Sequence, residues 1–138
     1  MRIQNLIFNR QKSREKFEKS ISIIPSEIAS NSIDEQFLHR ALQIIENNIA
    51  DSEYNAEKFC QDIRMSRSTL HRKLIALTNQ SATEFIRAIR LKRAAQLLSK
   101  KAATVSEIAY QTGFGNLSYF TKCFKDQFGK TPSEYSPS

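Results

Sequence analysis

Residues that break helices are scarce in this chain. Its 138 residues include three glycines, three prolines and no tryptophan. Leu, Ile, Ala, Lys, Glu and Gln are common instead, and these residues favour helices. Because 40% of the residues are hydrophobic, the chain can supply a core, which argues against wholesale disorder. No stretch alternates in the way that a strand requires, so we predict an all-α fold.

Cysteine is also scarce, which bears on metal binding and location. Cys60 and Cys123 each lie beside apolar positions of a helical pattern, and neither belongs to a CxxC motif or a His/Cys cluster. We therefore predict two reduced core cysteines, no metal site and no cofactor. No apolar run approaches the ~18 residues of a membrane span, and the N-terminal residues lack the apolar core of a signal peptide. These features predict a cytoplasmic segment without membrane contact.

The usual signs of catalysis are missing as well. The two histidines, His39 and His71, are far apart in the sequence. The chain has no GxSxG motif, no paired carboxylates and no glycine-rich phosphate loop. Since catalysis requires a nucleophile, an acid–base group and a pocket, we predict that the chain is not an enzyme.

Acidic residues are nearly missing from the middle of the chain. From Arg64 to Lys101 there are ten basic residues and one acidic residue, whereas residues 26–62 hold eight acidic and two basic residues. Within a chain of net charge +7, this basic block is typical of a surface that binds phosphates. The alternative interpretation is a solvated face of a basic protein.

The basic block overlaps a pattern that occurs twice. When residues 66–74 are aligned with residues 116–124, Leu70 falls on Phe120 and Leu74 falls on Phe124. Upstream, Phe59-Cys60 matches Ile108-Ala109, and the second copy carries one additional residue in its turn. Two copies of a helix-turn-helix unit predict a protein that reads two stretches of DNA.

Capping patterns predict where the helices begin. Four S/T-x-x-E boxes, which favour helix starts, open at Ser32, Ser81, Thr104 and Thr131. We predict a basic helix and linker in residues 1–33, a first lobe at about 34–81, a connecting helix at about 82–99 and a second lobe at about 104–136. The connecting helix would span roughly 25 Å at 1.5 Å per residue. That length can set two recognition helices near the ~34 Å between successive major-groove faces.

The second helix of each copy has two distinct faces, because a helix advances about 100° per residue. The core stripes are Leu70, Leu74 and Leu77 in the first copy and Phe120 and Phe124 in the second. Away from the core stripes, the candidate DNA contacts are mostly small polar or basic, as the major groove favours. They are Arg67, Ser68, Thr69, His71, Arg72, Leu117, Ser118, Tyr119, Thr121 and Lys122. Ser66 and Asn116 open the two helices as N-caps that can also lie at a phosphate. We predict these twelve residues as the DNA-binding set, with Arg72 as the foremost candidate for a base contact.

Three members of the set have a second interpretation. His71 is equally well explained as a solvated surface histidine. Tyr119 either reaches a phosphate through its hydroxyl group or packs on the protein. Leu117 either meets a thymine methyl group or covers the edge of the lobe.

One string of residues in the second half carries a family resemblance: Ile108-Ala109, Gly113-Phe114, Ser118-Tyr119-Phe120, Phe124-Lys125, Phe128-Gly129, Thr131-Pro132 and Tyr135. It resembles the DNA-binding domain of the AraC/XylS family of bacterial transcription regulators, and the first half adds Met65-Ser66-Arg67-Ser68 and Arg72-Lys73-Leu74. The resemblance implies two helix-turn-helix lobes within residues 34–138 that bind double-stranded DNA. It implies base-reading positions at Ser68, His71, Arg72, Leu117, Ser118 and Lys122. Arg64 departs from the pattern, because the family usually has glycine in that turn. The outer face of the second copy, with Leu117 and one lysine, is also less polar than in many relatives, so binding chiefly to the DNA backbone is the alternative for this lobe.

A narrower resemblance concerns the N-terminal residues. Arg10, Lys12, Arg14 and Lys16 are similar to the basic helix that leaves a receiver domain, and Pro25-Ser26-Glu27-Ile28 is similar to a linker of hybrid sensor kinases. This resemblance implies the C-terminal output domain of a two-component protein, which would be membrane-anchored if it is a hybrid kinase. A receiver domain N-terminal to this chain and RNA polymerase are then candidate partners. A free-standing small activator is the alternative.

Two rival functions differ in what they recognise. A helical protein-interaction module would use the basic face to bind an acidic partner and would not distinguish bases. An RNA-binding module would need an aromatic stacking surface, which the sequence does not provide.

Overall fold

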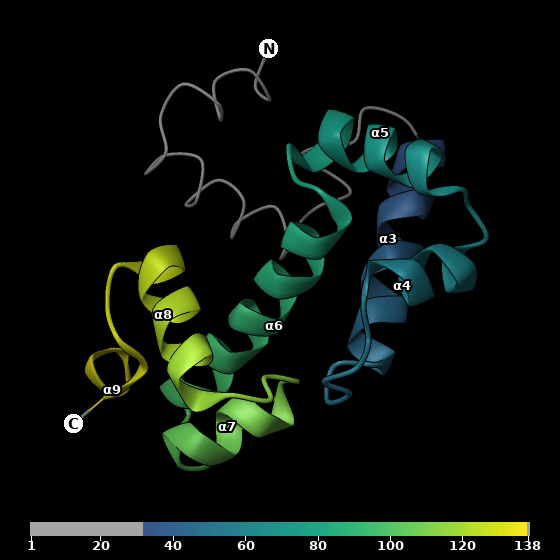
Figure 1. Ribbon diagram of the computed structural model, residues 1–138. Coiled ribbons are helices and arrows are strands. Elements are labelled where there is room, and N and C mark those ends of the chain that lie inside the picture. Colours follow the sequence, from purple (N-terminus) through teal and green to yellow (C-terminus); the bar gives the residue numbers. More distant parts are fainter. Residues whose placement is uncertain (1–31, 138) are drawn as a thin grey trace. The chain divides into compact units, whose positions relative to one another are not determined.

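The computed structural model describes residues 32–137. These residues fold into seven helices and no strand (Figure 1), which confirms the predicted all-α fold. The helices are α3 (Ser32–Asn47), α4 (Ala56–Ile63), α5 (Arg67–Thr78), α6 (Ala82–Ser99), α7 (Val105–Gln111), α8 (Leu117–Phe128) and α9 (Pro132–Tyr135). The basic helix and linker predicted for residues 1–33 lie outside the described residues except for the last two positions. None of the helices that the structure describes is long and apolar enough to cross a membrane.

The described residues form two compact units. The first unit comprises residues 32–47 and 55–86, and the second comprises residues 48–54 and 87–137. Helix α6 therefore contributes its first residues to the first unit and the rest to the second. Segment 48–54, which joins α3 to α4 in the sequence, belongs to the second unit.

The core of the first unit is built from one face of each of its helices. Its buried hydrophobic side chains are Phe37, Leu38, Ala41, Ile45, Phe59, Cys60, Ile63, Leu70, Leu74, Phe85 and Ile86. The rings of Phe59 and Phe85 stack with their centroids 6.3 Å apart. Cys60 is buried and forms no disulfide, as predicted for a reduced core cysteine.

The core of the second unit is mostly aromatic on α8. Phe120 and Phe124 are fully buried, which confirms the predicted core stripe of this helix. Their ring centroids lie 5.7 Å apart, and Phe114 packs on Phe120 at 5.0 Å. Helix α6 supplies Leu91, Ala94, Ala95 and Leu98, and α7 supplies Ile108 and Ala109. Cys123 is also buried and free of a disulfide.

Three of the four predicted capping boxes are present. The Glu84 carboxylate accepts from the Ser81 backbone N–H at 2.9 Å, and the Ser81 hydroxyl oxygen accepts from the Glu84 N–H at 3.2 Å. Thr104 with Glu107 and Thr131 with Glu134 make the same reciprocal pair of hydrogen bonds. Each box satisfies backbone donors that the first turn of a helix leaves without partners.

Two local predictions are wrong. Ser32 lies within α3 rather than at its N-cap, because the helical backbone already includes this residue. On α5, Leu77 is only half-buried, and Thr78 takes the buried position in line with Leu70 and Leu74. A threonine can occupy it because its hydroxyl group donates to the Leu74 carbonyl at 2.8 Å, so this hydroxyl is buried with a partner.

Candidate nucleic-acid interface

Helix α5 starts at a cap that uses two of the predicted site residues. The Ser66 hydroxyl oxygen accepts from the Thr69 backbone N–H at 3.2 Å, and the Ser66 hydroxyl donates to the Thr69 hydroxyl oxygen at 2.9 Å. The cap follows Arg64, whose backbone is left-handed with φ 61°. Ser66 and Thr69 therefore position the start of the helix.

The outer face of α5 is basic and polar, as predicted. Arg67, Ser68, His71 and Arg72 are all exposed. Lys73 differs from them because its Nζ lies 3.9 Å from Asp34 Oδ1 and 5.1 Å from the centre of the Phe37 ring. Its charge is directed back onto its own unit, which leaves the other four side chains as the surface available to a ligand.

Helix α8 starts in the same way. The Asn116 side-chain oxygen accepts from the Tyr119 N–H at 2.9 Å, which makes Asn116 the N-cap. Leu117, Ser118 and Lys122 are exposed, whereas Thr121 is half-buried. The structure thus brings the predicted residues of the second copy to the first half of one helix.

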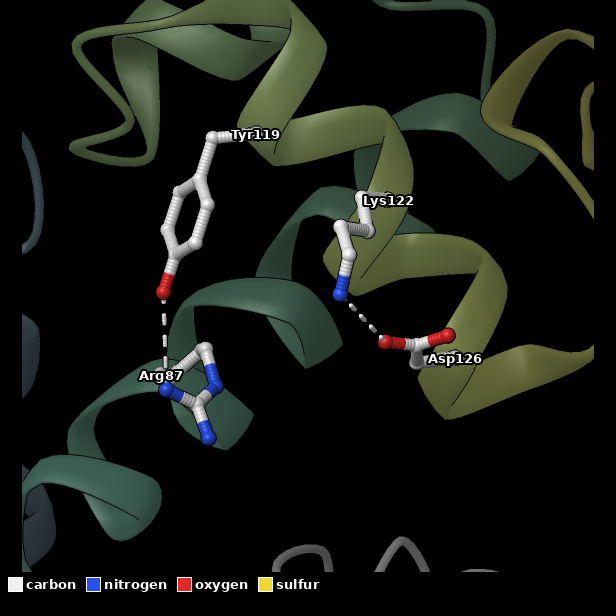
Figure 2. Close-up of polar contacts among 4 residues, drawn as sticks. All are labelled: Arg87, Tyr119, Lys122 and Asp126. Atoms are coloured by element: carbon white, nitrogen blue, oxygen red, sulfur yellow. Dashed lines mark hydrogen bonds and ion pairs between the residues drawn. The ribbon is translucent and has the colours of Figure 1, made fainter.

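Two residues that the sequence prediction missed pair with side chains of this helix (Figure 2). Arg87 of α6 points its guanidinium group at Tyr119, with Nη1 3.5 Å from the hydroxyl oxygen. Asp126 lies one turn beyond Lys122, and its Oδ2 is 3.6 Å from the lysine Nζ. The i,i+4 spacing could have indicated the ion pair. The approach of Arg87 depends on how α6 and α8 pack, which no local pattern reveals.

Helices α5 and α8 are each preceded by a left-handed residue at the matching position of the repeat. In the first unit this residue is Arg64, and in the second it is Gly113 with φ 88°. A Cβ atom on Gly113 would lie 2.8 Å from Arg90 Cζ and against the Ile49 carbonyl oxygen. Glycine at position 113 is therefore required by close packing as well as by backbone conformation.

The packing on Gly113 comes from a buried arginine. Arg90 of α6 donates from Nη1 to the Gly113 carbonyl at 2.9 Å and from Nη2 to the Asp51 carbonyl at 2.8 Å. A longer bond of 3.4 Å reaches the Tyr54 carbonyl. Burial lowers the pKa of Arg90 below its ordinary value, and the negative charge of Asp51 partly opposes this shift. The guanidinium group ties the turn before α8 to segment 48–54.

Metal-binding chemistry has little support in the described part of the chain. No group of three or more His, Cys, Asp or Glu side chains that could hold a metal ion occurs among residues 32–137. The exposed polar groups of α5 and α8 include hydroxyl donors and the cations Arg67, Arg72 and Lys122, which suit phosphates and the acceptor edges of bases.

A capped helix that follows a tight turn, with a polar and basic outer face, defines a helix-turn-helix DNA-binding domain, and this chain contains two such helices. A family model described as a helix-turn-helix domain matches residues 59–137. The chain belongs to this family, the AraC type of DNA-binding transcription regulator domain.

Individual relatives are larger than this chain. It is 46% identical over 135 residues to histidine kinase P4 of Formosa agariphila, a match that covers 98% of this chain and 10% of that protein. It is 31% identical over 106 residues to the Msm operon regulatory protein of Streptococcus mutans, covering 77% of this chain and 38% of that one. The chain thus spans well under half the length of these relatives.

Among solved structures, the C-terminal domain of AraT, a response regulator from Geobacillus stearothermophilus, is similar to the chain. The TM-score is 0.65 at 27% identity, and the match covers 72% of this chain and 83% of that one.

Proposed function

We propose that this chain binds double-stranded DNA sequence-specifically, with α5 and α8 as two recognition helices that enter adjacent major grooves. The observation that carries the proposal is the repeated construction of the two units. Each has a left-handed turn residue, a side-chain N-cap and a second helix with an exposed outer face of small polar and basic groups. Ser68, His71 and Arg72 would read bases from α5, and Leu117, Ser118 and Lys122 from α8.

The proposed DNA-binding domain covers residues 34–138, with lobes at about 34–81 and 104–136. Short side chains near the start of each recognition helix allow close approach to base edges, and arginine can donate two hydrogen bonds to guanine. The exposed basic side chains between Arg64 and Lys101 that do not read bases would contact phosphates and make binding strongly dependent on salt. Arg90 is not among them, because it is buried and donates to the Gly113 and Asp51 carbonyls.

Selection from a random duplex library tests this proposal directly. The expected result is an enriched site with two half-elements about one helical turn apart. Binding to that site should weaken steeply between about 50 and 200 mM salt. A steep salt dependence with no enriched sequence would contradict base reading and would favour the protein-interaction module.

Replacing Arg72 provides the sharpest single test of the α5 surface. Arg72→Ala should abolish the preference at one base position, since a bidentate contact contributes roughly 1–3 kcal/mol of discrimination. Lys100→Ala is the control, because Lys100 is also exposed and basic but lies outside both recognition helices. This control should weaken binding uniformly, if at all. If the Arg72→Ala variant keeps the wild-type preference at every base position, Arg72 makes no base contact and at most contacts a phosphate.

We further propose that the chain is the output domain of a phosphorylation-controlled two-component protein. Two similarities support this proposal. The chain is similar to a segment that makes up 10% of histidine kinase P4, and it is similar to the C-terminal domain of the response regulator AraT. A receiver domain and RNA polymerase are then the proposed protein partners. Phosphorylation of the full-length protein should change occupancy of the selected site, and equal occupancy with and without phosphorylation would refute this part.

A further inference from the structure

The outer face of α8 differs chemically from that of α5. In the first half of α5 the exposed side chains include Arg67 and Arg72, which are multiple hydrogen-bond donors. The matching exposed side chains of α8 are Leu117 and Lys122, so α8 begins with an apolar side chain and has one lysine in place of two arginines. The second helix therefore needs a different means of distinguishing bases.

The two long polar side chains in the first half of α8, Tyr119 and Lys122, have partners within the unit. The Tyr119 hydroxyl oxygen accepts from Arg87, and the Tyr119 ring lies 6.2 Å from the Phe114 ring. Lys122 is drawn toward Asp126, one turn further from the start of the helix (Figure 2). Leu117 remains as the large exposed side chain at the first position of α8, 39% exposed.

Leu117 can recognise only an apolar feature of a base pair. Its side chain neither donates nor accepts hydrogen bonds, and it would leave the polar edges of guanine, adenine or cytosine without partners. The C5 methyl group of thymine is the apolar group displayed in the major groove. The first residues of a recognition helix are also those that reach base edges, and the neighbouring Ser118 is small enough to permit close contact.

We propose that Leu117 is a specificity-determining residue that selects thymine in the second half-element by packing on its 5-methyl group. This proposal rests on the proposed function, because it requires α8 to lie in a major groove. It assigns different chemistry to the two lobes: hydrogen bonding by arginine in the first and methyl contact by leucine in the second.

Replacing thymine with deoxyuridine removes the methyl group and preserves base pairing, so it isolates this contact. The probe is the selected duplex with each thymine of the second half-element replaced in turn, bound to the full chain. Replacement of the thymine that Leu117 contacts should weaken binding about fourfold. This factor corresponds to the ~0.8 kcal/mol that burial of one methyl-sized group contributes. In Leu117→Ala the thymine and deoxyuridine duplexes should bind equally, because the partner of the methyl group is gone.

Ile75→Ala provides a matched control. Ile75 is an apolar residue on α5, and its exposed fraction of 37% is nearly the same as that of Leu117. The control should keep the fourfold effect at the same thymine. A second half-element with no position sensitive to deoxyuridine, or a sensitivity that persists undiminished in Leu117→Ala, would overturn the assignment.

The failure of this inference is distinguishable from failure of the proposed function. If the wild-type chain enriches no duplex sequence, both are wrong. If it enriches a two-part site whose second half tolerates deoxyuridine everywhere, only the role of Leu117 is wrong. Equal melting temperatures of wild type and Leu117→Ala would show that any lost methyl effect comes from the contact and not from unfolding of the unit.

Discussion

Gly113→Ala should destabilise the second unit far more than an ordinary glycine substitution. Gly113 has φ +88°, and the added Cβ would lie 2.8 Å from Arg90 Cζ and against a backbone carbonyl. Arg90 has little freedom to move away, because it donates to the Gly113 and Asp51 carbonyls. The substitution therefore combines backbone strain with displacement of a buried charged group.

The two contributions can be separated by magnitude. Left-handed backbone costs a non-glycine residue ~1–2 kcal/mol. Losing one hydrogen bond of a buried charged group adds ~1.5–3 kcal/mol. Together they give about 2.5–5 kcal/mol for Gly113→Ala. Gly129→Ala is the control, since Gly129 has φ +81° but no atom within 4 Å of its added Cβ. It should lose only the ~1–2 kcal/mol of backbone strain.

Urea unfolding followed by circular dichroism measures the difference. At a typical slope of ~2 kcal/mol per M, a 2 kcal/mol gap between the two variants separates their midpoints by about 1 M. Equal midpoints would mean that the Arg90 side chain moves away from the added methyl group without loss of stability. That result would refute the rigid packing inferred for this turn. A Gly129→Ala variant that is less stable than Gly113→Ala would refute it as well.

Two further predictions concern the stability of the second unit. Phe120→Ala should cost about 3–5 kcal/mol, because it leaves a cavity beside Phe114 and Phe124; an unchanged thermal midpoint would show that the core face of α8 is wrongly assigned. Hydrogen bonds from the capping threonines, first of all from their backbone N–H groups, lower the pKa values of Glu107 and Glu134 below the ordinary 4.5. Their contribution to stability is then complete above about pH 4.5 and is lost as pH falls through the lower folded-state values. Urea midpoints should therefore drop as the pH is lowered below about 4.5, and a Glu107→Gln, Glu134→Gln double variant should show a shallower drop. An equal drop in the wild type and the double variant would exclude this origin.

Local patterns predicted most of the helices because their ends are determined locally. A capping box requires only residues three positions apart, and those at Ser81, Thr104 and Thr131 were predicted correctly. The core stripe of α8 likewise follows from the helical period. The predicted DNA-binding residues stay predictions, although the structure places most of them on the exposed faces of α5 and α8.

Long-range contacts were beyond the reach of these patterns. The Arg90 side chain bonds to carbonyl groups 23 and 39 residues away, so no periodicity indicates it. The first helix of the repeat was also missed. Leu38, Ala41 and Ile45 of α3 have the same spacing as Leu91, Ala94 and Leu98 of α6, and all six are buried. The connection after α3 is longer than the one after α6, so the spacing that aligns the later helices does not align these two.

This extended repeat explains why the same turn tolerates arginine in one unit and requires glycine in the other. The residue before Leu91 is Arg90, which packs on Gly113. The residue before Leu38 is Phe37, a buried apolar side chain with the Lys73 ammonium group over its ring. Arg64, at the position that matches Gly113, adopts φ 61° with its side chain exposed. The two units thus share a left-handed turn residue, and in the second unit the Arg90 guanidinium group lies against the position that a Cβ atom of that residue would take.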